Sequence, residues 1–97
     1  LNTLGRTALD QGDREAARAA FAQSEHHLDG RRQTLGGGYL YCQALAGRVA
    51  AGEDRAMLPR ALDLFRERTS FNWSWMWQCS DEVTREDLAR AEAAAGA

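Results

Sequence analysis

The 97-residue sequence has no lysine and no isoleucine, and it contains one proline and two cysteines. All 12 basic residues are arginines, and 14 acidic residues give a formal net charge of −2. A nucleic-acid-binding surface needs excess positive charge, so we expect no direct nucleic-acid contact. No apolar run approaches the roughly 20 residues that span a bilayer, and no signal peptide is visible. These absences predict a cytoplasmic protein without a membrane partner.

The usage of Arg, Ala and Gly is typical of a GC-rich coding sequence, which indicates a bacterial source. The chain begins at Leu1 rather than Met, and we expect it to be a fragment of a larger regulatory protein. Its length corresponds to a single domain over residues 1–97.

Cys42 and Cys79 lie within apolar runs, which favours two reduced, packed thiols over a disulfide or a redox pair. A zinc site is less favoured, because there is no CxxC motif and neither His26 nor His27 has a thiol nearby. Glu25 and His26 are expected on a solvated helix face. The GxSxG, HExxH and GxGxxG motifs are also missing. We therefore expect no catalytic residue, no metal, no cofactor and no enzymatic activity.

Helical spacing of apolar residues predicts an all-α chain of about five helices. The expected segments are about 2–11, 14–28, a third that starts between Thr34 and Tyr39 and ends at Gly52, about 59–68, and 80–95. Leu1, Leu4, Ala8 and Leu9 form the expected apolar stripe of the first segment.

Turn and capping residues separate these segments. Gly12 is expected to end the first helix and Asp13 to cap the second, which makes the two an antiparallel hairpin. Gly36-Gly37-Gly38 favour a loop or a closely packed spot, with a phosphate cradle as the alternative. Pro59 suits the first position of a helix, and Ser80 or Thr84 is expected to cap the last one.

Internal repetition is present but imperfect. The pattern Ala17-x-x-x-Phe21 returns as Ala61-x-x-x-Phe65, and the turn after Leu9 has an echo near Gly52. Helix pairs of about 40 residues are therefore expected over about 1–29 and 34–69.

The first 24 residues resemble a tetratricopeptide repeat. Leu1, Leu4-Gly5, the turn at Gly12-Asp13, and Ala17 with Phe21 match that family's pattern, whereas Ala8 replaces its Tyr and its closing Pro is absent. Small side chains at Gly5, Ala8 and Ala17 would let the two helices approach, with Phe21 filling the space beside them.

This resemblance implies stacked helix pairs in a short right-handed superhelix with a groove for a protein partner. The expected groove residues are Asn2, Thr3, Arg6, Asp10, Gln43 and Arg90. Arg6 and Arg90 could clamp a partner carboxylate by bidentate pairing, or both could be ordinary surface residues.

An aromatic connector over 70–79 interrupts the repeats, with Trp73, Trp75 and Trp77 inside it. Its alternation is typical of a strand, yet no second strand is evident to pair with it. It could pack as a cap over the second helix pair, form an exposed patch for a partner, or line a ligand pocket.

The sequence as a whole predicts a scaffold that binds a peptide or a partner domain. The alternative is a homo-oligomerisation module that uses the Trp-rich segment.

Overall fold

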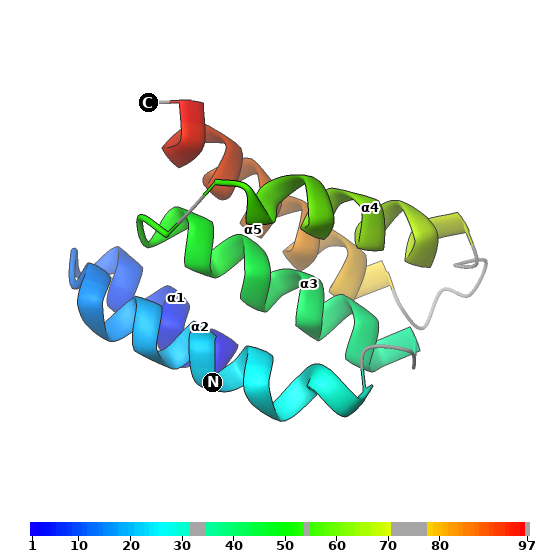
Figure 1. Ribbon diagram of the computed structural model, residues 1–97, viewed down its shortest axis with the longest axis horizontal. Coiled ribbons are helices and arrows are strands. Elements are labelled where there is room, and N and C mark those ends of the chain that lie inside the picture. Colours follow the sequence, from blue (N-terminus) through cyan, green and yellow to red (C-terminus); the bar gives the residue numbers. More distant parts are fainter. Residues whose placement is uncertain (32–34, 54, 71–77, 97) are drawn as a thin grey trace.

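The computed structural model describes residues 1–31, 35–53, 55–70 and 78–96, and within them it contains five α-helices and no strand (Figure 1). The prediction of an all-helical chain with five helices is confirmed. In chain order the elements are α1 (Asn2–Asp10), α2 (Arg14–Leu28), the 3-10 helix η1 (Asp29–Arg31), α3 (Leu35–Ala50), α4 (Met57–Ser70) and α5 (Gln78–Gly96).

The turn between α1 and α2 forms for the reasons that the sequence suggested. Gly12 adopts a φ of +77°, a left-handed conformation that glycine accepts without strain. The carboxylate of Asp13 accepts a hydrogen bond from the backbone N–H of Ala16 at 3.1 Å, which caps α2. Gly52 lies in the turn after the end of α3 and also has a positive φ, of +97°.

Two local expectations were wrong, and a third was wrong in part. For the glycines at 36–38 the loop is wrong, since they lie in the first turn of α3, where the glycine penalty of helix interiors does not apply. Ser80 and Thr84 lie inside α5 and cannot cap its start, since the helix begins at Gln78. Pro59 is the third residue of α4, where its missing N–H still falls in the first turn.

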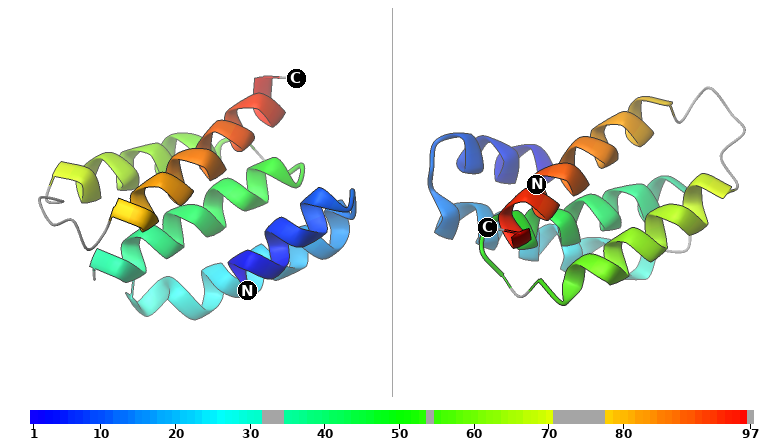
Figure 2. Two further views of the ribbon diagram at one scale, coloured as in Figure 1. Left: turned by 180° about the vertical axis from the view of Figure 1, so that it is seen from behind. Right: turned by 90° about the horizontal axis from the view of Figure 1, so that it is seen from above.

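Helix α3 lies at the centre of the molecule and packs against all four other helices. Seen from behind, it lies between the α1–α2 hairpin on one side and α4 and α5 on the other, while the view from above shows α1 next to α5 (Figure 2). Its buried side chains include Tyr39, Cys42, Leu45 and Val49, and Phe65 of α4 and Leu88 of α5 join them in the larger apolar cluster. Tyr39, Cys42, Ala46 and Val49 follow one another at intervals of three or four residues, which is the spacing of a single helix face.

A smaller cluster surrounds Phe21, whose side chain is completely buried (0% exposed). A Cβ placed on Gly5 would lie 2.7 Å from the Phe21 ring, and one placed on Gly47 would lie 2.3 Å from it. The ring therefore fits between α1 and α3 only because both helices present a bare backbone there. The predicted contact between Gly5 and Phe21 is confirmed, and Gly47 supplies a second wall.

The expected apolar stripe of α1 was wrong in part. Its buried residues are Asn2, Gly5 and Ala8, while Leu1 and Leu4 are exposed. The glycine selects this face because it admits the Phe21 ring, and Asn2 is buried along with it. As a result, α1 presents leucines to the outside and an amide to the inside.

Candidate partner-binding site

The structure brings five of the sequence-predicted site residues together along α1, α3 and α5. Hydrogen bonds connect side chains of these three helices, although the residues are up to 81 positions apart in the chain. The five are Asn2, Arg6, Asp10, Gln43 and Arg90. We call the connected group Asn2, Arg6, Gln43, Thr84 and Asp87 the polar seam.

Arg6 and Asp87 form the strongest contact of the polar seam. Arg6 Nε donates to Asp87 Oδ1 at 3.0 Å and to Oδ2 at 3.2 Å, and Arg6 Nη2 donates to Oδ2 at 2.6 Å. Asp87 is 8% exposed, so this two-sided pair is largely shielded from solvent. The guanidinium expected to meet a partner carboxylate is thus already paired inside the chain.

Gln43 links that ion pair to the first turn of α1. Its Oε1 accepts from Arg6 Nη2 at 2.7 Å, and its Nε2 donates to Thr84 Oγ1 at 2.9 Å. Because a guanidinium has no acceptor, the Gln43 amide is fixed with its oxygen toward Arg6. Gln43 is 3% exposed, so its orientation is a property of the fold and not of the solvent.

Asn2 is the last member of the polar seam. Its Nδ2 donates to the backbone carbonyl of Leu40 at 3.1 Å and faces Gln43 Oε1 at 3.5 Å. Its Oδ1 is buried and has no hydrogen-bond partner among the residues that the structure describes. A buried amide oxygen without a donor costs about 1–3 kcal/mol, which makes this atom a candidate point of ligand contact.

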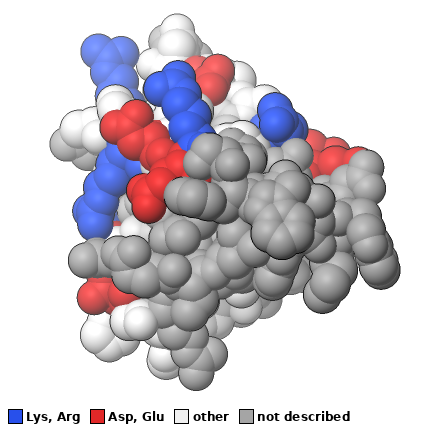
Figure 3. Space-filling view, turned by 90° about the vertical axis from the view of Figure 1, so that its right-hand side faces the viewer, with Lys and Arg blue, Asp and Glu red and all other residues white. Residues whose placement is uncertain are grey.

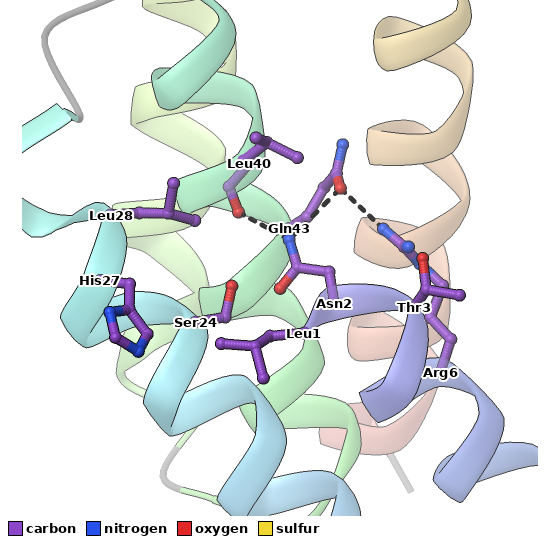
Figure 4. A pocket seen from close by; sticks show the side chains of 9 residues that line it. All are labelled: Leu1, Asn2, Thr3, Arg6, Ser24, His27, Leu28, Leu40 and Gln43. Atoms are coloured by element: carbon purple, nitrogen blue, oxygen red, sulfur yellow. Dashed lines mark hydrogen bonds between the residues drawn. The ribbon is translucent and has the colours of Figure 1, made fainter.

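A pocket of about 290 Å³ opens beside Asn2. Its apolar wall comes from Leu1, Leu28 and Leu40, and Ser24, His27 and Asn2 add polar groups. In Figure 4 the amide oxygen of Asn2 is turned toward the side of Ser24 and Leu1, away from the hydrogen bonds to Leu40 and Gln43. Leu1 and Leu40 are both exposed, so the pocket has an apolar rim.

At the other end of α1, Arg90 Nη2 donates to Asp10 Oδ1 at 2.5 Å. Both side chains are largely exposed, and exposed ion pairs contribute about 0–1 kcal/mol. The pair joins α1 to α5 at the surface, and Arg90, like Arg6, has an internal carboxylate partner.

The sequence reasoning missed three contributors to the site: Asp87, Thr84 and the Leu40 carbonyl. Thr84 was expected to cap the last helix, and Asp87 follows it closely in the sequence, near a helix start where acids usually serve the backbone. The usable signal was their i, i+3 spacing, which places them on one face of α5. No sequence feature indicated the backbone carbonyl.

A second polar group lies between α2 and α3. Arg48 pairs with Glu25 through Nη1, and its Nη2 lies 3.5 Å from Glu53 Oε1. The Tyr41 hydroxyl donates to Glu25 at 3.4 Å. The expectation that Glu25 is solvated was therefore wrong, since α3 covers it, whereas His26 is exposed as expected. This group joins helices and leaves no open acceptor like that of Asn2.

Of the remaining sequence-predicted residues, Thr3 is exposed and lines the pocket beside Asn2, whereas Trp73, Trp75 and Trp77 lie outside the described residues. On the end of the molecule shown in Figure 3, the described arginines lie beside acidic residues and form no patch of one sign. Within the described ranges, no three His, Cys, Asp or Glu side chains are grouped to hold a metal ion. No helix there has the length and hydropathy to cross a membrane.

Comparisons with protein-family models, with curated proteins and with solved structures found no match to this chain.

Cys42 lies on α3 close to the polar seam, and it is a buried free thiol that donates to the Ala61 carbonyl at 3.1 Å. Burial raises the pKa of the Cys42 thiol from 9.0 to about 12, and the negative charge of Asp87 adds to the shift. Cys79, the other cysteine, has a side chain outside the described part of the structure.

We expect this thiol to lower stability in alkali. Above about pH 9 the unfolded chain releases the Cys42 proton while the folded chain keeps it until about pH 12. The unfolded state then binds fewer protons, so the free energy of unfolding falls as pH rises, by at most ~1.4 kcal/mol per pH unit. Urea denaturation of the wild type and of Cys42→Ala across this range measures the difference. Equal pH dependence in both proteins would contradict the prediction.

Proposed function

We propose that this chain is a scaffold that binds a peptide or a partner domain along the face formed by α1, α3 and α5. The role is binding without chemistry, and the site consists of Asn2, Arg6 and Gln43 with the pocket beside them. A tetratricopeptide-like superhelix, in which these three helices are the first members of successive pairs, is part of the same proposal.

The observation that supports this proposal most is the buried Oδ1 of Asn2, a residue that lines the pocket, because this oxygen has no hydrogen-bond partner in the described part of the chain. A fold gains nothing by burying an amide oxygen without a donor, so the arrangement makes sense as a contact that a partner completes. The exposed leucines beside it give the same face an apolar contact area.

Selection of binding peptides, followed by NMR mapping, tests the proposal. A displayed random peptide library is selected against the immobilised domain, and each selected peptide is titrated into ¹⁵N-labelled protein. We expect the largest chemical-shift changes at residues of α1, α3 and α5 around Asn2 and Gln43. Changes centred on the exposed face of α2, around Glu15 and Gln23, would contradict the proposed site.

The alternative of self-association through Trp73, Trp75 and Trp77 involves residues outside the described structure. Sedimentation velocity at the NMR concentration separates it from partner binding. A monomer is expected throughout. A dimer of the wild type that becomes a monomer when the three Trp residues are replaced would favour self-association over the scaffold proposal.

A further inference from the structure

We infer that the pocket beside Asn2 binds one neutral, apolar residue of a polypeptide, whose backbone N–H donates a hydrogen bond to Asn2 Oδ1. This inference rests on the proposed function and specifies its partner chemistry. The partner's first contact is then an apolar side chain together with its backbone amide, and not a charged group held by Arg6.

The polar seam decides that the pocket presents an acceptor. Asn2 could in principle be turned over, which would place its NH₂ group in the pocket. The turned amide would then aim its oxygen at the Leu40 carbonyl and at Gln43 Oε1, which are both acceptors. Gln43 cannot turn in response, because Arg6 Nη2 requires its oxygen. Asp87 in turn holds Arg6, so α5 fixes the direction of an atom on α1.

A ligand must therefore provide a hydrogen-bond donor to Asn2 Oδ1. The charges around the pocket decide whether this donor is cationic or neutral. A cationic amine would approach the start of α1, which has no acidic residue in its first turn and no side-chain cap. The partial positive charge of that helix end disfavours a cation. A carboxylate has no proton to give to Asn2 Oδ1, and the nearby Arg6 guanidinium is already paired with Asp87. A neutral amide N–H meets both conditions.

The size and lining of the pocket indicate which chemical group is attached to that donor. A volume of about 290 Å³ lies at the lower limit of small-molecule sites, which hold roughly 300–1,000 Å³. Three leucines, Leu1, Leu28 and Leu40, form most of its apolar wall. One aliphatic side chain with its own peptide unit fits this space better than a large cofactor does.

The probe for this inference is N-acetyl-leucine N-methylamide, titrated into ¹⁵N-labelled protein. Saturable shifts of the Asn2 side-chain NH₂ and of the Leu40 and Gln43 amides are expected. The fully N-methylated analogue keeps the leucine side chain but has no N–H, and it is expected to bind about three- to tenfold more weakly. N-acetyl-leucinate, which adds a carboxylate, is expected to bind no more tightly than the parent probe.

A variant separates the hydrogen bond from steric effects of the methyl groups. In Asn2→Ala the two probes are expected to bind equally, because the acceptor has gone. The matched control is Leu4→Ala, which removes an exposed leucine of α1 that does not line the pocket. It should keep the full difference between the probes.

Three results would overturn the inference: equal binding of both probes to the wild type, a difference that persists in Asn2→Ala, or no saturable shift up to the solubility limit of the parent probe. The first and third of these results need only folded wild-type protein, so they stand even if Asn2→Ala is unstable. If the probes fail while selected peptides still map to α1, α3 and α5, the proposed function holds and only its chemistry is wrong.

Discussion

Replacing Phe21 with alanine is expected to lower the free energy of unfolding by about 3–5 kcal/mol. The side chain is completely buried and is the largest member of the cluster that joins α1, α2 and α3. Its removal leaves a cavity walled by the backbones of Gly5 and Gly47, which cannot collapse without moving whole helices. For a domain with a stability of roughly 5–15 kcal/mol, this loss is a large fraction of the total. Urea denaturation followed by circular dichroism measures it.

The complementary change, Gly47→Ala, tests the same packing from the opposite side. Alanine in a helix interior normally gains about 1 kcal/mol over glycine. Here its Cβ would lie 2.3 Å from a confined ring, so we expect a net loss of about 1–3 kcal/mol. Gly30→Ala is the matched control, because no atom of the described residues lies within 4 Å of its added Cβ. A Gly47→Ala protein as stable as the wild type would show that the ring is not confined.

A double-mutant cycle makes the interpretation specific. Phe21→Leu shortens the side chain and removes the part of the ring nearest to both glycines. The added cost of Gly47→Ala should therefore be smaller in the Phe21→Leu background than in the wild type. Strictly additive losses would mean that the two sites do not share a contact.

Replacing Asp87 with alanine is expected to cost about 2–4 kcal/mol. The change leaves the Arg6 guanidinium, whose side chain is 24% exposed, with Gln43 as its only remaining seam partner. Breaking a buried ion pair costs about 3–5 kcal/mol, and the residual exposure of Arg6 places this pair toward the lower end. Asp10→Ala is the matched control, since it breaks the exposed pair with Arg90 and should cost less than about 1 kcal/mol.

The loss of stability in Asp87→Ala could come from the lost attraction or from the Arg6 charge left without a partner. The double variant Arg6→Met with Asp87→Leu distinguishes these two causes. It removes both charges and should recover most of the stability that Asp87→Ala loses. Binding of the leucine probe should still weaken in the double variant, because Gln43 would no longer be held toward Asn2. Recovery of stability together with unchanged probe affinity would show that the polar seam does not position Asn2.

Most of the helix boundaries could be predicted because their signals are local. Gly12 makes the turn after α1, and the next residue, Asp13, caps α2 through the N–H of Ala16. Gly52 makes the turn after α3 by its own positive φ. The start of α5 could not be predicted in this way. Thr84 looks like a cap in sequence, but its hydroxyl accepts from Gln43, 41 residues away.

The candidate site was predictable only in part. The family-like pattern placed Asn2, Arg6, Asp10, Gln43 and Arg90 on one side, and the structure connects them with their neighbours in space. Their internal partners were not predictable, because a sequence shows that an arginine is present but not whether a carboxylate of another helix already faces it. For this reason Arg6 looked like a free clamp, although it pairs with Asp87.

By itself, the sequence determined that this chain is helical, where its main turns fall, and that α2 buries Ala17 and Phe21. These properties follow from backbone propensities and from spacings within a few residues. The sequence offered two faces of α1 for burial, the leucine stripe and the side of Gly5 and Ala8. Only the tertiary structure decided between them, because that choice depends on whether Phe21 fits against Gly5 or against a leucine. The same packing turned Leu1 outward and Asn2 inward, and contacts between helices then left the Asn2 oxygen without a donor among the described residues.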